Sequence, residues 1–173
     1  FRRVLFRSDE ITLDAVGHDD FVTKVYEANR RIYLDTVTGV YNRRYFDDKI
    51  FCHNSRGDIS KNVSFILINV RDFGDAGDVY GPAEGEKLLK AFSEVLCADV
   101  RDQDSVIRYS DDTFLVVLNN CTEKTAHERV KLFSDGISRI VYRNKKAAQA
   151  YIGCASANKF DESDDSIGSL ITA

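Results

Sequence analysis

The chain has 173 residues, which suits one domain with a short extension, and its 43% hydrophobic and 30% charged content is ordinary for a globular protein. No apolar run approaches the roughly 18 residues that would span a bilayer, and no secretory signal opens the sequence, so we expect a cytoplasmic location, as a separate protein or as the cytoplasmic portion of a larger one. The formal net charge of -4 argues against DNA or RNA as a partner, because nonspecific nucleic-acid binding needs a basic field.

The first predicted helix follows two acidic residues and carries a narrow apolar stripe. Asp19 and Asp20 are suitable N-caps for a helix that runs to about Leu34. Its apolar positions are spaced four, three and four residues apart, which is helical spacing: Phe21, Val25, Ala28 and Ile32. Two interpretations stay open, a helix that packs on its own domain and a linker that pairs with a second copy in a homodimer.

The rest of the chain alternates between helical and strand patterns. Residues 43–53 predict a helix, and the apolar, β-rich run at 63–70 predicts a buried central strand. Pro82 opens a helix that ends near Asp99. The remaining predicted elements are strands 106–109 and 114–118 around a polar turn, a helix from Thr122, a strand at 147–157 and an acidic loop at 158–166. This order predicts an α+β fold with a mainly antiparallel sheet.

Three short segments carry motifs. Leu34–Phe46 reads Leu-Asp-Thr-Val-Thr-Gly-Val-Tyr-Asn-Arg-Arg-Tyr-Phe, and residues 108–114 read Arg-Tyr-Ser-Asp-Asp-Thr-Phe. The first resembles the Asp-x-Leu-Thr-Gly-Leu-x-Asn-Arg-Arg signature of the GGDEF family, and the second lies where that family has Arg-Tyr-Gly-Gly-Asp-Glu-Phe. The Tyr-Ile-Gly-Cys-Ala segment at 151–155 is similar to the family's Ser-Ile-Gly-Val-Ala strand. Active members of this family condense two GTP molecules into cyclic di-GMP.

The resemblance implies a specific fold and domain organisation. We expect the ferredoxin-related, palm-like fold of GGDEF domains and nucleotide cyclases, with a central, mainly antiparallel sheet and helices on both faces. Residues 34–173 would form a GGDEF domain with a truncated C-terminus, and residues 1–33 an extension with a linker helix. The chain contains no methionine, so we expect a fragment of a longer protein with an upstream sensor domain.

The residues at the family's metal positions are altered. The resemblance places the first metal-binding carboxylate at Asn69, a backbone carbonyl at Val70 and the second carboxylate at Asp112. An amide oxygen is neutral and is a weaker ligand for Mg²⁺ than a carboxylate. A purely structural role for Asp112 as a polar turn residue stays open. We therefore expect no cofactor, and Mg²⁺ only if some activity remains.

The substrate-binding positions are altered as well. Ser110 and Asp111 replace two glycines that let backbone approach phosphates, and Thr113 replaces a glutamate. Asp111 would place a negative charge beside a polyphosphate, and two unit charges 4 Å apart repel by ~4 kcal/mol at an effective dielectric near 20. Arg71 stands where the family has an acid, and Glu86, at a guanine-reading position, is a remnant with a longer carboxylate.

One further pattern is similar to an inhibitory product site found in many GGDEF domains. Arg101-Asp-Gln-Asp104 matches the family's Arg-x-x-Asp motif just before the hairpin. A guanidinium can donate two parallel hydrogen bonds to the guanine edge, and a carboxylate can accept from its N–H groups. The alternative is an ordinary surface turn that Asp104 caps, and the sequence leaves both open.

These residues together favour a catalytically inactive GGDEF regulatory module of a bacterial signalling protein, with cyclic di-GMP as its candidate ligand at Arg101 and Asp104. The first alternative is an active diguanylate cyclase that uses Asp112 with Asn69. The second is a dimerisation or protein-interaction module that binds no nucleotide.

Overall fold

A computed structural model of the protein describes residues 19–51, 62–71, 73, 81–142 and 146–157. The predicted acidic loop at 158–166 lies outside these residues. Within them, no helix combines the length and the apolar character that crossing a membrane requires.

A five-stranded sheet forms the centre of the domain, in the order β1-β3-β4-β2-β7. The interior strand β2 (Val63–Val70) is almost entirely buried and pairs antiparallel with β4 on one side and β7 on the other, which confirms the predicted buried strand within the sheet. Among the described strands of this sheet, β1 pairs in parallel with β3 and the other pairings are antiparallel. The other strands span Tyr41–Asn42 (β1), Ser105–Arg108 (β3), Thr113–Asn119 (β4) and Ala150–Ala157 (β7).

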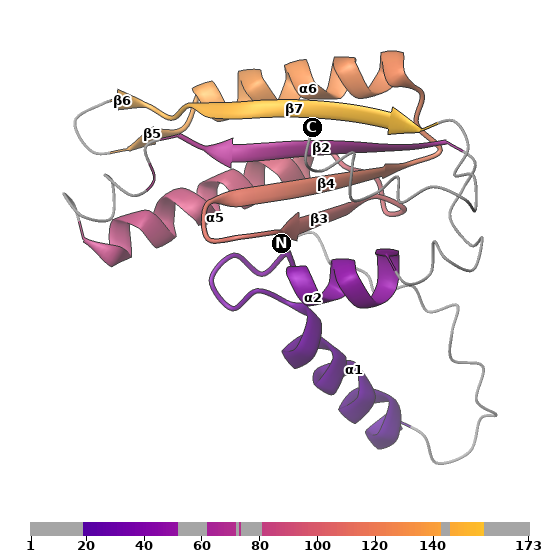
Figure 1. The fold of residues 1–173 in the computed structure, drawn as a ribbon. Coiled ribbons are helices and arrows are strands. Elements are labelled where there is room, and N and C mark those ends of the chain that lie inside the picture. Colours follow the sequence, from indigo (N-terminus) through magenta and orange to yellow (C-terminus); the bar gives the residue numbers. More distant parts are fainter. Residues whose placement is uncertain (1–18, 52–61, 72, 74–80, 143–145, 158–173) are drawn as a thin grey trace.

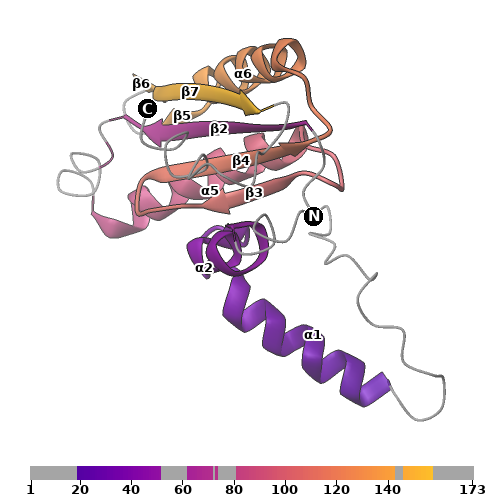
Figure 2. The same ribbon diagram turned by 45° about the vertical axis from the view of Figure 1, so that its right-hand side comes forward.

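Helices cover both faces of this sheet, as predicted. Helices α5 (Pro82–Ala98) and α6 (Glu123–Ser138) lie on one face, where they bury an apolar cluster that includes Phe92, Phe114 and Phe133 (Figure 1). The short helix α2 (Arg43–Tyr45) and the π-helical turn η2 (Phe46–Phe51) contribute to a second, smaller cluster on the other face. Helix α1 (Asp19–Tyr33) projects away from the sheet, as Figure 2 shows from a second side.

Two predicted elements differ from the observed ones. The predicted helix at 43–53 is a three-residue helix that continues as the wider turn η2. The predicted strand at 147–157 is broken, because Ala148 turns its side chain into the core and its N–H donates to the carbonyl of Ile140 at 2.8 Å. The strand before the break, β6 (Lys146–Ala147), pairs antiparallel with β5 (Val141–Tyr142) in a separate two-stranded sheet.

Candidate functional site

The turn between β3 and β4 brings together four of the residues predicted at the altered active site. The Asn69 amide donates to the Thr113 hydroxyl at 2.9 Å, and that hydroxyl donates to Asp112 Oδ1 at 2.9 Å. The Ser110 hydroxyl donates to the same oxygen at 3.2 Å. We call these four residues the turn network. Its three substituted members bond to one another or to the retained acid, so they form one connected set.

Backbone hydrogen bonds hold this turn against the end of the central strand. Register pairs Asn69 with Thr113 across the two strands, which places their side chains on the same face of the sheet. One step further, the N–H of Val70 donates to the backbone carbonyl of Asp112 at 2.8 Å. The side chain of Val70 is buried in the core. The sheet itself therefore aligns the residues of the turn network.

The turn network does not suit a divalent cation. Asn69 directs its donor nitrogen, not its oxygen, toward the turn, and one oxygen of Asp112 already accepts two hydroxyl protons. Mg²⁺ needs several hard oxygen ligands in octahedral geometry. Among the described residues, no group of three or more acidic, histidine or cysteine side chains is placed to hold a metal. The metal that the family resemblance implies does not fit these residues.

An ion pair that the sequence analysis did not single out fixes the start of the turn. Arg108 Nη1 lies 3.1 Å from Asp35 Oδ1 and 3.2 Å from Oδ2, and Nη2 donates to the backbone carbonyl of Asp111 at 2.9 Å. The two side chains are only 14% and 18% exposed. Asp35 lies in the first quoted motif and Arg108 in the second. Their place in these motifs was the sequence feature that could have indicated a role for the pair. The pair ties the loop after α1 to the hairpin turn.

The environment of Asp35 shifts its titration. Burial raises the pKa of this carboxyl, but hydrogen bonds from the Thr38 hydroxyl and backbone N–H, together with the charge of Arg108, outweigh burial and leave the pKa below its ordinary value. The Thr38 hydroxyl and N–H donate to Oδ1 at 2.7 and 2.8 Å. The ionised form of Asp35 is therefore the stabilised one.

Aromatic contacts pack the segment that includes β1 and α2 against the start of the β3–β4 turn. The Arg43 guanidinium lies 4.3 Å from the centroid of the Tyr109 ring, and Phe46 meets that ring edge-on. Tyr41 and Tyr45 stack with centroids 3.6 Å apart. The segment that includes β1 and α2 therefore packs on the residue that opens the turn.

The Arg101–Asp104 turn lies at the other end of the β3–β4 hairpin. The four residues of β3 separate it from the turn network, a span of about 13 Å. Arg101 is exposed. Each oxygen of Asp104 accepts one backbone N–H, from Arg101 and from Asn119, both at 3.0 Å. The carboxylate therefore holds the turn together.

Two other altered positions are Glu86 and Arg71. Glu86 is exposed on α5. Arg71 donates to Gln149 Oε1 at 2.9 Å, and its guanidinium lies 5.7 Å from the centroid of the exposed Tyr151 ring. These contacts place a positive charge at the sheet end where the resemblance implies an acid.

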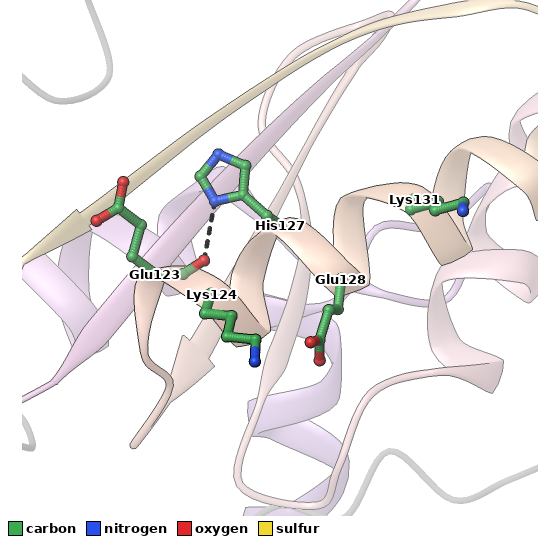
Figure 3. A pocket seen from close by; sticks show the side chains of 5 residues that line it. All are labelled: Glu123, Lys124, His127, Glu128 and Lys131. Carbon is green, nitrogen blue, oxygen red and sulfur yellow. Dashed lines mark hydrogen bonds between the residues drawn. The ribbon is translucent and has the colours of Figure 1, made fainter.

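A shallow hollow of about 580 Å³ lies elsewhere, along the outer face of α6. Figure 3 shows that its lining side chains all come from this helix: Glu123, Lys124, His127, Glu128 and Lys131. The ring of His127 bonds to the carbonyl of Glu123 within the same helix, with 2.9 Å between the atoms. This charged helix surface contains none of the residues predicted to bind a ligand.

Sequence comparison identifies relatives over most of the chain. The family model described as "Diguanylate cyclase, GGDEF domain" matches residues 32–171. Diguanylate cyclase A of Treponema denticola is 30% identical over 141 residues, covering 77% of this chain and 38% of that protein. Diguanylate cyclase DgcZ of Escherichia coli is 27% identical over 103 residues, covering 60% of this chain and 34% of that protein. The chain thus spans little more than a third of these relatives.

Solved structures share the fold at low sequence identity. The diguanylate cyclase SiaD of Pseudomonas aeruginosa, in complex with its activator SiaC, superposes with a TM-score of 0.73 at 17% identity, covering 90% of this chain and 62% of that one. The GGDEF domain of DgcB from Caulobacter crescentus, in complex with cyclic di-GMP, gives 0.68 at 15% identity, covering 81% of each. Fold and motifs agree with the family match, and the chain belongs to the GGDEF domain family of diguanylate cyclases.

Proposed function

We propose that this chain is a noncatalytic GGDEF domain that serves as a regulatory module in cyclic di-GMP signalling. The observation that carries this proposal is the turn network, in which the retained acid Asp112 accepts two hydroxyl protons and the Asn69 amide directs its nitrogen to the Thr113 hydroxyl. A cyclase needs that acid as a metal ligand beside a triphosphate. The exposed Asp111 adds a charge that repels the substrate.

The direct test is a turnover assay of the 173-residue chain with GTP and either Mg²⁺ or Mn²⁺. We expect no cyclic di-GMP above a mock-purified control, while diguanylate cyclase A of Treponema denticola serves as the positive control. The Asn69→Asp variant should stay inactive, because Asp111 and the hydroxyls of the turn network remain. Product formed by the unmodified chain would refute the proposal and support the active-cyclase alternative.

A ligand role at Arg101 follows as the second part of the proposal. Arg101 is exposed on a turn with a fixed backbone, and its guanidinium can donate two parallel bonds to guanine or phosphate. The related DgcB domain was solved with cyclic di-GMP. Calorimetry of the chain against cyclic di-GMP tests this part. An absence of heat and of thermal stabilisation at ligand concentrations well above micromolar would favour the interaction-module alternative.

Helix α1 is suited to act as the linker between an upstream sensor domain and this domain. It projects from the sheet (Figure 2). Ile32, in its last turn, is 41% exposed. An exposed apolar side chain on a protruding helix suits pairing with a second copy. Light scattering over a range of concentrations checks this homodimer, and Ile32→Lys should shift the equilibrium toward monomer if the proposal is right.

A further inference from the structure

We propose that Gln103 and Asn119 are positioning residues for Arg101. They lock the 101–104 turn into one shape, and Asp104 does the same from inside the turn instead of contacting a ligand. This inference rests on the proposed cyclic di-GMP site. Each side-chain amide donates to the other residue's backbone carbonyl, Gln103 Nε2 to Asn119 at 3.1 Å and Asn119 Nδ2 to Gln103. We call this reciprocal pair the amide clasp.

Asp104 completes the clasp with its carboxylate. One oxygen accepts the N–H of Arg101, and the other accepts the N–H of Asn119. The N–H of Asp104 in turn donates to the carbonyl of Arg101 at 3.0 Å. Both oxygens are thus oriented by main-chain donors of two different segments, the turn and the end of β4. A guanine edge would have to share acceptors that the fold already uses.

The strand end that holds the turn is itself fixed. Asn120 has a φ of 49°, a left-handed conformation that few residues other than glycine and asparagine adopt readily. The next residue, Cys121, donates its N–H to the carbonyl of Asn62 at 3.2 Å, and its side chain is buried. On the other side of the turn, Arg129 of α6 donates to the carbonyl of Asp99. The clasp therefore anchors the turn to a rigid part of the domain.

A preformed turn matters because Arg101 must place a planar group. A guanidinium gives two parallel hydrogen bonds only if its plane matches that of the guanine edge or of two phosphate oxygens. Fixing the backbone beforehand removes part of the ordering cost from the binding step. A lysine at the same position makes point contacts and tolerates a looser backbone. The clasp should therefore contribute to affinity only while an arginine stands at position 101.

This dependence defines the experiment. Calorimetry with cyclic di-GMP is run on the 173-residue chain, on Gln103→Ala, on Arg101→Lys and on the double variant. Gln103→Ala should weaken binding by about three- to tenfold, the equivalent of one net hydrogen bond. In the Arg101→Lys background the same change should alter affinity by less than about twofold. Asp102→Asn is the matched control, since Asp102 is exposed in the same turn, and it should not weaken binding.

A role confined to stability would give a different result. Gln103→Ala would then lower the melting temperature equally in both backgrounds and leave the dissociation constant unchanged, which would overturn the inference. Amide hydrogen exchange supplies the second measurement: the N–H groups of Arg101 and Asn119 should exchange faster in Gln103→Ala, and unchanged rates would also overturn it. If the unmodified chain binds no cyclic di-GMP, the proposed ligand fails and takes the inference with it. If binding depends on Arg101 but not on Gln103, only the inference fails.

Discussion

The ion pair between Asp35 and Arg108 should be one of the larger single contributions to the stability of this domain. Asp35→Ala removes both contacts to the guanidinium and both hydrogen bonds from Thr38. A hydrogen bond to a charged group contributes about 1.5–3 kcal/mol, and removing one partner of a fully buried pair costs about 3–5 kcal/mol. Both side chains retain some exposure, 14% and 18%, so water partly compensates the orphaned charge. We therefore expect a loss of about 2–4 kcal/mol in the free energy of unfolding.

Urea denaturation followed by circular dichroism at pH 7 measures this loss. Asp47→Ala is the matched control, because Asp47 pairs with Arg43 at 3.7 Å and both side chains are more than half exposed. Breaking that pair should cost at most about 1 kcal/mol. If Asp35→Ala costs no more than Asp47→Ala, the ion pair does not stabilise the fold as we infer.

The pH dependence gives an independent check on the same pair. Because the pKa of Asp35 is lowered in the folded state, its ionisation contributes stability above the unfolded pKa of about 4. That contribution is lost as the pH falls through the folded pKa. The stability gap between the unmodified chain and Asp35→Asn should therefore be full at pH 7 and narrow at acidic pH. A gap that is equal at pH 7 and pH 3 would refute the assignment.

Four further substitutions test the turn network, two glycine positions and the proposed ligand contact. Thr113→Val removes the hydroxyl at the centre of the turn network and should cost about 1–2 kcal/mol in a denaturant titration, whereas an unchanged midpoint would mean that water replaces it. Gly136→Ala would place a Cβ 2.6 Å from a methyl of Val95, so we expect a loss of about 1–3 kcal/mol by thermal melting; a neutral result would show that the contact relaxes freely. Gly39→Ala should cost about 1 kcal/mol by the same assay, since its φ is +74°, and equal stability would show that the loop adopts another conformation. Arg101→Ala should weaken cyclic di-GMP binding by about ten- to a hundredfold in calorimetry, and unaltered affinity would remove Arg101 from the site.

Strong local patterns made much of the fold predictable. The largely apolar eight-residue run of β2 is typical of a strand that is buried on both faces, and its bounds agree with the prediction. The β1 strand has two residues and pairs in parallel with β3, so no period reveals it. The break at Ala148 also escaped prediction, because a small apolar residue fits a strand and a buried bend equally well.

The site was predictable as a set of positions but not as a set of contacts. The family motifs assigned Asn69, Asp112 and Thr113 to one site, and the pairing of β2 with β4 places Asn69 opposite Thr113. Sequence could not show that their side chains bond to one another, because this depends on rotamers at the end of the sheet. Likewise, Gln103 and Asn119 lie sixteen positions apart and have no motif that links them.

The position of β2 in the sheet has a consequence for synthesis of the chain. Its residues 63–70 leave the ribosome well before either neighbour, since β4 begins at Thr113 and β7 at Ala150. At about 5–20 residues per second, β7 follows the end of β2 by roughly 4–16 s. For that time a strongly apolar segment has no partner strand on one side, and it is then open to chaperones or to strands of other nascent chains. The yield of folded protein in cells should therefore depend on translation rate and on chaperone supply. The stability of the folded domain alone would not predict this dependence.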